Sequence, residues 1–205
     1  MIEPQPSTVS CWSCCGPVVA NATFCGTCAA IQPPRTCDRF RILGFDVQFD
    51  MDAAELERRY FSRQRELHPD RFAAKSARER EYAMQHTANL NEAFTVLNSP
   101  VKRAEILLDT LGYPVRPSGD ETVANEEVLL DAMEMRERLA DAETVAAVDI
   151  AIGDSVTKTG DCIAALSGAF EANNVEAALL LTMRLTYLDK FGVEARERRL
   201  RLEAT

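Results

Sequence analysis

The tripeptide His68-Pro69-Asp70 constrains the fold of this chain more than any other short segment. Proline has no backbone N–H, and it disfavours helical backbone at the residue before it. A helix that approaches the tripeptide must therefore end near Leu67. The break leaves His68 and Asp70 on a corner that we expect to be exposed.

Helical patterns lie on both sides of this corner. Asp52 followed by Glu55 is close to a capping box and marks a helix start. Apolar residues recur at helical spacing before and after the tripeptide, which predicts two antiparallel helices. Arg63 interrupts the first stripe, and we expect its methylenes to cover the core while its guanidinium stays in water. The expected core positions are Leu56, Tyr60 and Leu67 in the first helix and Met84, Leu90, Phe94 and Leu97 in the second.

This arrangement, with the short segment 40–43 before it, resembles a J-domain. In that family the His-Pro-Asp loop and the basic helix before it engage a DnaK-type ATPase chaperone and stimulate its ATP hydrolysis. An exposed carboxylate can pair with a partner's arginine, and a cationic helix face suits an acidic surface. The alternative is that His68 merely caps a helix C-terminus. The resemblance implies a chaperone-binding site formed by His68, Pro69, Asp70, Arg58, Arg59 and Arg65.

Six of the seven cysteines lie in the first forty residues, as two Cys-x-x-Cys pairs and two further thiols. Pairs with this spacing turn two thiolates inward, and two pairs complete a tetrahedral sulfur site. Cys11, Cys14, Cys25 and Cys28 are therefore the expected ligands of a structural zinc ion. Cys15 is an alternative to Cys14, and an iron-sulfur cluster would use the same kind of ligand.

Other residues of this segment have simpler expected roles. Gly16 and Gly26 would supply the close turns of the metal site, and Trp12 would pack on it. Cys37, beyond the prolines at 33–34, is a spare thiol. Disulfides are not expected in a reducing compartment.

The formal net charge of -9 is carried by the second half of the chain. Residues 1–119 hold 14 acidic and 14 basic side chains, and residues 120–205 hold 18 acidic and 9 basic ones. This charge argues against nucleic acid as a partner, because binding to a phosphate backbone usually needs a net cationic face. No apolar run approaches the roughly 20 residues of a membrane span. The N-terminus has no signal or transit pattern, which predicts a cytoplasmic protein, or one of the mitochondrial matrix if the source is eukaryotic.

Three helical patterns follow a further short helix at 101–111 and a turn-rich run at 112–119. We expect the breaks between them near 150–154 and at 173–174. The middle pattern predicts the seam of a three-helix bundle. Its positions are Ile152, Val156, Thr159, Ile163, Leu166 and Phe170, with Cys162 beside them as a small buried thiol.

The outer two patterns contain more apolar residues than one seam needs. Their expected core positions are Val128, Ala132, Met135 and Leu139 in the first and Ala178, Leu181, Leu185 and Leu188 in the third. The surplus residues suggest a partner surface, although a wide buried stripe is also ordinary. They are Leu129, Met133, Leu180, Met183, Tyr187 and Phe191.

A J-domain followed by an acidic bundle resembles the HscB family of iron-sulfur cluster co-chaperones, from about Asp38 to the C-terminus. The segments 103–108, 129–139 and 185–190 are similar to family signatures. In that family an apolar patch on the bundle binds the scaffold protein IscU. The double Cys-x-x-Cys module resembles the long form of eukaryotic members. The resemblance implies a scaffold-binding patch at Leu129, Leu130, Met133, Glu134 and Tyr187.

The expected fold is all-α in four parts: a zinc-knuckle module at 1–37, a J-domain at 38–112, a linker at 113–121 and a three-helix bundle at 122–205. By resemblance the chain delivers an IscU-type scaffold to an HscA or DnaK-type chaperone and stimulates the chaperone's ATPase. It is not expected to be an enzyme, and no phosphate-cradling glycine loop occurs. The alternatives are a general J-protein that delivers unfolded clients and a thiol or metal enzyme built on the cysteine module.

Overall fold

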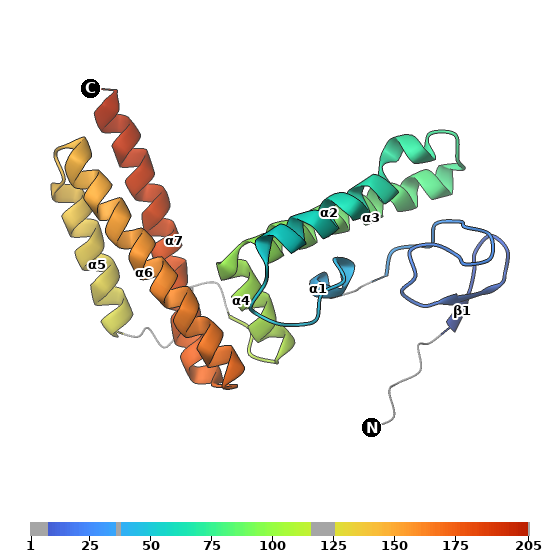
Figure 1. The fold of residues 1–205 in the computed structure, drawn as a ribbon, viewed down its shortest axis with the longest axis horizontal. Coiled ribbons are helices and arrows are strands. Elements are labelled where there is room, and N and C mark those ends of the chain that lie inside the picture. The colour runs from blue at the N-terminus through green and yellow to red at the C-terminus, as the bar shows by residue number, and fades with distance from the viewer. Residues whose placement is uncertain (1–7, 36–37, 116–125, 205) are drawn as a thin grey trace. The chain divides into compact units, whose positions relative to one another are not determined.

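The computed structural model describes residues 8–35, 38–115 and 126–204. The chain divides into two compact units, Met1–Asn98 and Ser99–Thr205, and both are built mainly from helices (Figure 1). The all-α expectation is confirmed, with one small sheet added. Cys37 and the greater part of the expected linker lie outside the described residues.

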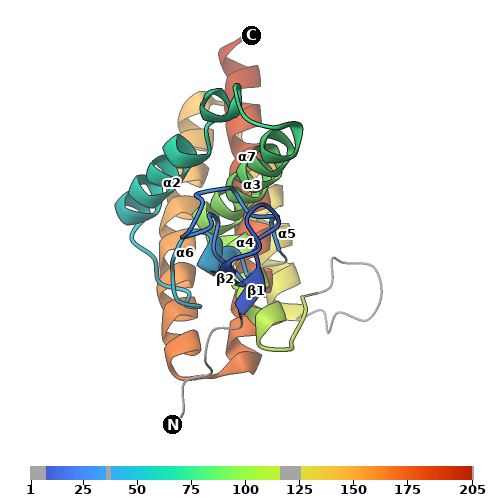
Figure 2. The same cartoon turned by 90° about the vertical axis from the view of Figure 1, so that its right-hand side faces the viewer.

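The first unit begins with the cysteine-rich module, whose strands β1 (Thr8–Ser10) and β2 (Pro17–Val19) pair antiparallel. The two strands lie together in Figure 2. A very small cluster of buried Cys11, Val18 and Cys25 holds the module together. A segment of this size cannot bury enough apolar surface to fold unaided, so it needs a covalent or metal staple.

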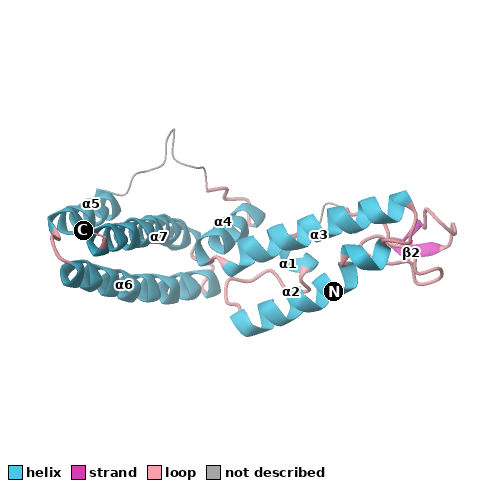
Figure 3. Ribbon diagram, turned by 90° about the horizontal axis from the view of Figure 1, so that it is seen from above, coloured by secondary structure: helices cyan, strands magenta, loops and turns pink. Residues whose placement is uncertain are grey.

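Three α-helices and one 3-10 helix complete the first unit: α1 (Arg39–Ile42), α2 (Ala53–Leu67), η1 (Pro69–Phe72) and α3 (Ala77–Asn98). Helices α2 and α3 run antiparallel (Figure 3). Asp52 caps α2 by accepting a 2.9 Å hydrogen bond from the Ala54 N–H. Helix α2 ends at Leu67, as the proline break predicts.

The core of this hairpin uses smaller residues than the apolar pattern suggested. Met84, an expected core residue, is 60% exposed, whereas Ala83 and Ala93 are buried beside Leu90 and Leu97. Alanine allows α2 and α1 to approach α3 closely. A search for large apolar side chains at helical spacing does not identify alanine as a core residue. Tyr60 of α2 stacks on Phe94 of α3 with ring centroids 4.2 Å apart.

The second unit contains α4 (Pro100–Thr110), α5 (Glu126–Asp141), α6 (Val145–Glu171) and α7 (Val175–Glu203). Ser99 caps α4, and Pro100 occupies its first turn. Helix α4 packs against α7, so the compact unit already begins at Ser99. The finer division of the sequence into four parts, with a boundary at 112, stays a prediction.

Two expectations for the bundle were wrong. The predicted break at 150–154 lies inside α6, which begins at Val145 with Thr144 as its cap. The predicted seam is also displaced, because Val156 is 64% exposed and the adjacent Ser155 is buried. The small polar side chain of Ser155 thus lies on the buried face where the pattern demanded the apolar Val156. The buried residues of α6 are Val148, Ser155, Cys162 and Leu166.

The outer helices follow the expected core more closely. Val128, Met135 and Leu139 of α5 are buried, as are Ala178, Leu185 and Leu188 of α7. Phe191 was counted among the surplus residues but is only 4% exposed and belongs to the core. Among the described helices, none combines the length and the apolar character that crossing a bilayer requires.

A matched pair of substitutions in α6 tests the displaced seam. Leu166 is fully buried, so Leu166→Ala should destabilise the second unit by about 2–5 kcal/mol through lost burial and a residual cavity. Val156→Ala on the exposed face should change the free energy of unfolding by less than about 0.5 kcal/mol. Amide hydrogen exchange across α5–α7 measures both. Equal losses for the two variants would contradict the assignment.

Candidate functional site

Buried Phe72 anchors the corner that follows α2 to the core of the first unit. Its side chain is 6% exposed, and η1 packs on α3, while the side chains of His68 and Asp70 are 54% and 91% exposed. His68 Nδ1 accepts a 3.3 Å hydrogen bond from the Asp70 N–H, and the His68 carbonyl accepts from the Arg71 N–H at 3.0 Å. His68 therefore ends α2 and caps η1, and the Asp70 carboxylate is presented to solvent.

The three arginines of α2 that were expected to bind the chaperone fall into two groups. Arg58 is largely solvent-facing although it pairs with Glu55, and Arg65 is exposed. Arg59 instead pairs with Glu55 at 2.5 Å, donates to the Gly44 carbonyl and lies over the Phe45 ring. Arg58 and Arg59 lower the pKa of Glu55 to about 2, so its carboxylate stays charged. The Arg59 guanidinium is thus committed to the turn before α2.

The two Cys-x-x-Cys pairs meet in one cluster. The Sγ atoms of Cys11, Cys14, Cys25 and Cys28 all lie within 4.8 Å of one another. The contacts Cys11–Cys28 and Cys14–Cys25 are both 3.7 Å. A tetrahedron of sulfurs around zinc, with bonds of about 2.3 Å, has edges of about 3.8 Å. The four thiols therefore fit one tetrahedral metal ion.

Each pair sits on the same backbone turn. The Cys11 carbonyl accepts from the N–H of Cys15, and the Cys25 carbonyl accepts from the N–H of Ala29. In each turn the residue that donates this hydrogen bond has a left-handed backbone, with φ of 60° at Cys15 and 59° at Ala29. Cys15 thus closes the first knuckle and lies outside the cluster, which favours Cys14 as the second ligand. Gly26 lies inside the second turn, and the Gly16 carbonyl accepts a 2.8 Å hydrogen bond from the Cys11 N–H, but neither glycine occupies the left-handed position.

Backbone amides around the cluster favour thiolates. The N–H groups of Cys14 and Ser13 lower the pKa of Cys11 to about 6 against the cost of burial. The N–H groups of Cys28 and Thr27 lower the pKa of Cys25 in the same way. At Cys14 the Gly16 amide acts in this direction, but hydrogen bonds from neighbouring thiols raise the pKa to about 12. A cation at the centre would allow all four sulfurs to be thiolates together.

The module docks on α3 through contacts that the sequence did not reveal. The Trp12 indole N–H donates to the Ile31 carbonyl at 2.7 Å, while its ring meets Tyr82 edge-on with centroids 6.0 Å apart. Arg78 lies over the same ring, 5.1 Å from its centroid. His86 Nε2 is 2.9 Å from the Gln32 carbonyl, and burial lowers the pKa of His86, so the neutral ring donates this bond.

The expected scaffold-binding residues lie on α5 and α7. Leu130 and Met133 are 54% and 65% exposed, and Glu134 is also exposed, with Arg138 as a distant ion-pair partner at 3.9 Å. Leu129 and Tyr187 are half-buried. The α5 face therefore carries two exposed apolar side chains one helical turn apart.

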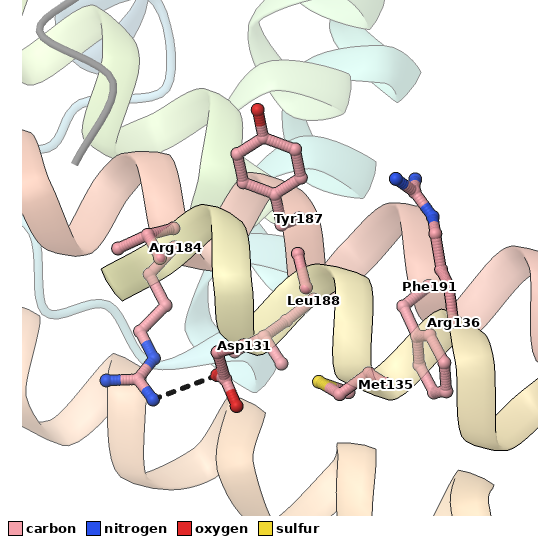
Figure 4. A pocket seen from close by; sticks show the side chains of 9 residues that line it. Asp131, Met135, Arg136, Arg184, Tyr187, Leu188 and Phe191 are labelled. Atoms are coloured by element: carbon pink, nitrogen blue, oxygen red, sulfur yellow. Dashed lines mark hydrogen bonds and ion pairs between the residues drawn. The ribbon is translucent and has the colours of Figure 1, made fainter. Parts of the chain in front are cut away.

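Asp131 and Arg184 line a shallow depression beside Tyr187 (Figure 4), and both belong to an ion-pair network. Asp131 of α5 accepts from Lys158 of α6 at 2.6 Å and from Arg184 of α7 at 3.0 Å. These hydrogen bonds, the one from Lys158 foremost, lower the pKa of Asp131. Sequence reasoning missed the network because its three members come from three helices with no shared local pattern.

Three comparisons with known proteins bear on this chain. Residues 124–196 match the family described as "HSCB C-terminal oligomerisation domain". The iron-sulfur cluster co-chaperone protein HscB of Mus musculus is 32% identical over 194 residues, which cover 91% of this chain and 79% of the mouse protein.

Solved structures give the same relationship. The crystal structure of human co-chaperone protein HscB superposes with a TM-score of 0.85 at 29% identity, covering 92% of this chain and 97% of the human one. Chaperone HscB from Vibrio cholerae gives a TM-score of 0.70 at 28% identity, covering 81% and 99%. The likeness extends over the cysteine module, the helical hairpin and the bundle, and this chain belongs to the HscB family of co-chaperones.

Proposed function

We propose that this protein acts in iron-sulfur cluster assembly by bringing an IscU-type scaffold protein to a DnaK- or HscA-type chaperone and stimulating the chaperone's ATPase. The observation that carries the proposal is the exposed corner at 68–70, held between α2 and α3 by buried Phe72. The names of its relatives, which are iron-sulfur cluster co-chaperones, agree with this role. The family consists of co-chaperones and not of known enzymes, and ATP hydrolysis is assigned here to the partner.

The corner offers the chaperone one carboxylate and a cationic helix face. The Asp70 carboxylate is solvated, and its nearest ionic partner among the described residues is His68 Nδ1 at 3.6 Å, so an arginine of the chaperone can reach it in bidentate geometry. Arg58 and Arg65 supply the cations that would steer an acidic partner surface into place. Arg59 contributes by fixing the turn before α2.

The patch for the scaffold is centred on Leu130 and Met133, with Leu129, Glu134 and Tyr187 around them. Methionine is a flexible apolar side chain that suits an adaptable contact. The Tyr187 hydroxyl points away from Asp131 (Figure 4) and can stay hydrated at the edge of an interface. The ion-pair network of Asp131, Lys158 and Arg184 ties the three helices together beneath this surface.

The metal proposed for the four cysteines is zinc in a structural role. The S···S distances fit a closed tetrahedral site, which leaves no open position for substrate. Free thiols elsewhere in the chain suit a reducing compartment such as the bacterial cytoplasm or the mitochondrial matrix.

His68→Gln tests the chaperone contact. The imidazole caps η1 and lies at the exposed corner. Its loss should abolish the stimulation, so that the chaperone hydrolyses ATP at its basal rate, while the helical content of the variant is unchanged. Steady-state ATP hydrolysis by HscA and by DnaK, with and without scaffold, measures the effect. Lys75→Gln, exposed just beyond the corner, serves as the control and should stimulate normally. Full stimulation by the His68 variant would remove the corner from the contact.

The double variant Leu130→Ala/Met133→Ala tests the patch. Both side chains are exposed, so the fold should be retained while scaffold affinity falls by about 2 kcal/mol or more, as for central apolar anchors. Isothermal titration calorimetry with an IscU-type scaffold measures the change. Val156→Ala removes an equally exposed apolar group of α6 outside the patch and should bind normally. An unaltered affinity of the double variant would exclude the patch.

Removal of the metal tests the cysteine module. Because the module has almost no apolar core, chelation under reducing conditions should unfold residues 8–34. NMR spectra should lose the dispersed amide signals of the module and show shifts at Tyr82 and His86, where it docks. Signals of α5–α7 should not change. A module whose signals survive complete metal removal would contradict the proposal.

A further inference from the structure

A cavity of about 150 Å³ opens inside the first unit, and neither the four clustered cysteines nor residues 68–70 line it. It lies where the cysteine module meets α1, α2 and α3. Residues 20–23 and 33–35 line it on the module side, and Arg41, Arg63 and His86 are among the helical residues that line it. None of the roles proposed above uses this cavity.

Three arginines line the cavity, whereas none of its described lining residues is acidic. Arg35 and Arg41 are exposed and take part in no ion pair between described residues. Arg63 has one partner, Glu66, at a distance of 3.7 Å, and both side chains are more than 40% exposed. Three like charges around one opening repel one another and create a positive potential that an anion would relieve.

Uncharged residues complete the wall. Ile42, Leu67 and Leu90 supply an apolar surface, and Thr23 and Asn89 supply neutral polar groups. His86 adds no charge, because burial keeps its ring neutral and its Nε2 is engaged by the Gln32 carbonyl. The wall thus suits a ligand with a short carbon skeleton, and the arginines suit its charged ends.

We propose that this cavity binds a small organic anion with two carboxylates. The guanidinium fork matches a carboxylate in bidentate geometry, which a lysine or a neutral donor cannot reproduce. A cavity of about 150 Å³ holds a molecule of roughly the size of benzene, so the ligand is a compact metabolite and not a nucleotide. Inorganic phosphate would satisfy the arginines but leave the apolar wall without a contact.

The experiment uses the full-length, metal-loaded chain and follows ¹⁵N NMR signals during titration with succinate. The Nε–H groups of Arg41 and Arg63 and the amides of Asn89 and Leu90 should shift and saturate. Succinamide, the neutral analogue of the same shape, should produce no saturating shift. Inorganic phosphate at equal ionic strength should bind more weakly than succinate.

Two variants separate this site from general effects of salt. Arg41→Gln and Arg63→Leu should each weaken succinate binding by about tenfold or more, as expected for the loss of a charged hydrogen bond. Arg63→Leu restores an apolar residue in the α2 stripe and should fold. Arg80→Gln, an exposed arginine of α3 outside the cavity, should bind succinate as the parent chain does.

Several results would overturn the proposal. Succinate that gives no saturating shift up to millimolar concentration would show that the cavity has no useful affinity for dicarboxylates. Equal binding of succinamide would show an apolar site without anion recognition. Phosphate that binds as tightly as succinate would show a simple oxyanion site. Unchanged affinity in both arginine variants would place the binding elsewhere.

Discussion

Burial of Phe72 beneath the Pro69 break is the constraint on which the rest of the first unit depends. Proline ends α2, and the aromatic side chain three residues later returns the chain to the core, so that α3 can begin. Asp70 and Arg71, which lie between Pro69 and Phe72, therefore face solvent. The packing of the hairpin therefore enforces the exposure of Asp70, and His68, as the C-cap of α2, lies at the same exposed corner.

Much of this architecture could be predicted from local signals in the sequence. Pro69 predicts the end of α2, Asp52 predicts its start, and the Cys-x-x-Cys spacing predicts a four-sulfur cluster. Each of these signals acts within a few residues, through backbone hydrogen bonds or the reach of a turn. The choice of Cys14 over Cys15 could not be predicted in this way. It depends on a left-handed backbone at Cys15, a conformation that sequence patterns normally predict only at glycine.

The remaining features depend on contacts between distant residues. The buried face of α6 includes Ser155, whose burial reflects available space in the bundle and not hydrophobicity, whereas the burial of Cys162 agrees with the sequence-based expectation. The meeting of Trp12 with Tyr82 joins two segments 70 residues apart. The ion pairs of Asp131 depend on how three helices are rotated against one another. A periodic pattern within one helix contains none of this information.

The docking of the module on α3 gives the protein an intrinsic optical probe. Trp12 is the single tryptophan of the chain, and its indole lies between a cysteine knuckle and a helix of the hairpin, beside a tyrosine and a guanidinium. Emission excited at the red edge of protein absorption therefore originates at this one junction. Its wavelength and lifetime register the attachment of the cysteine module without any label, and the bundle contributes no background.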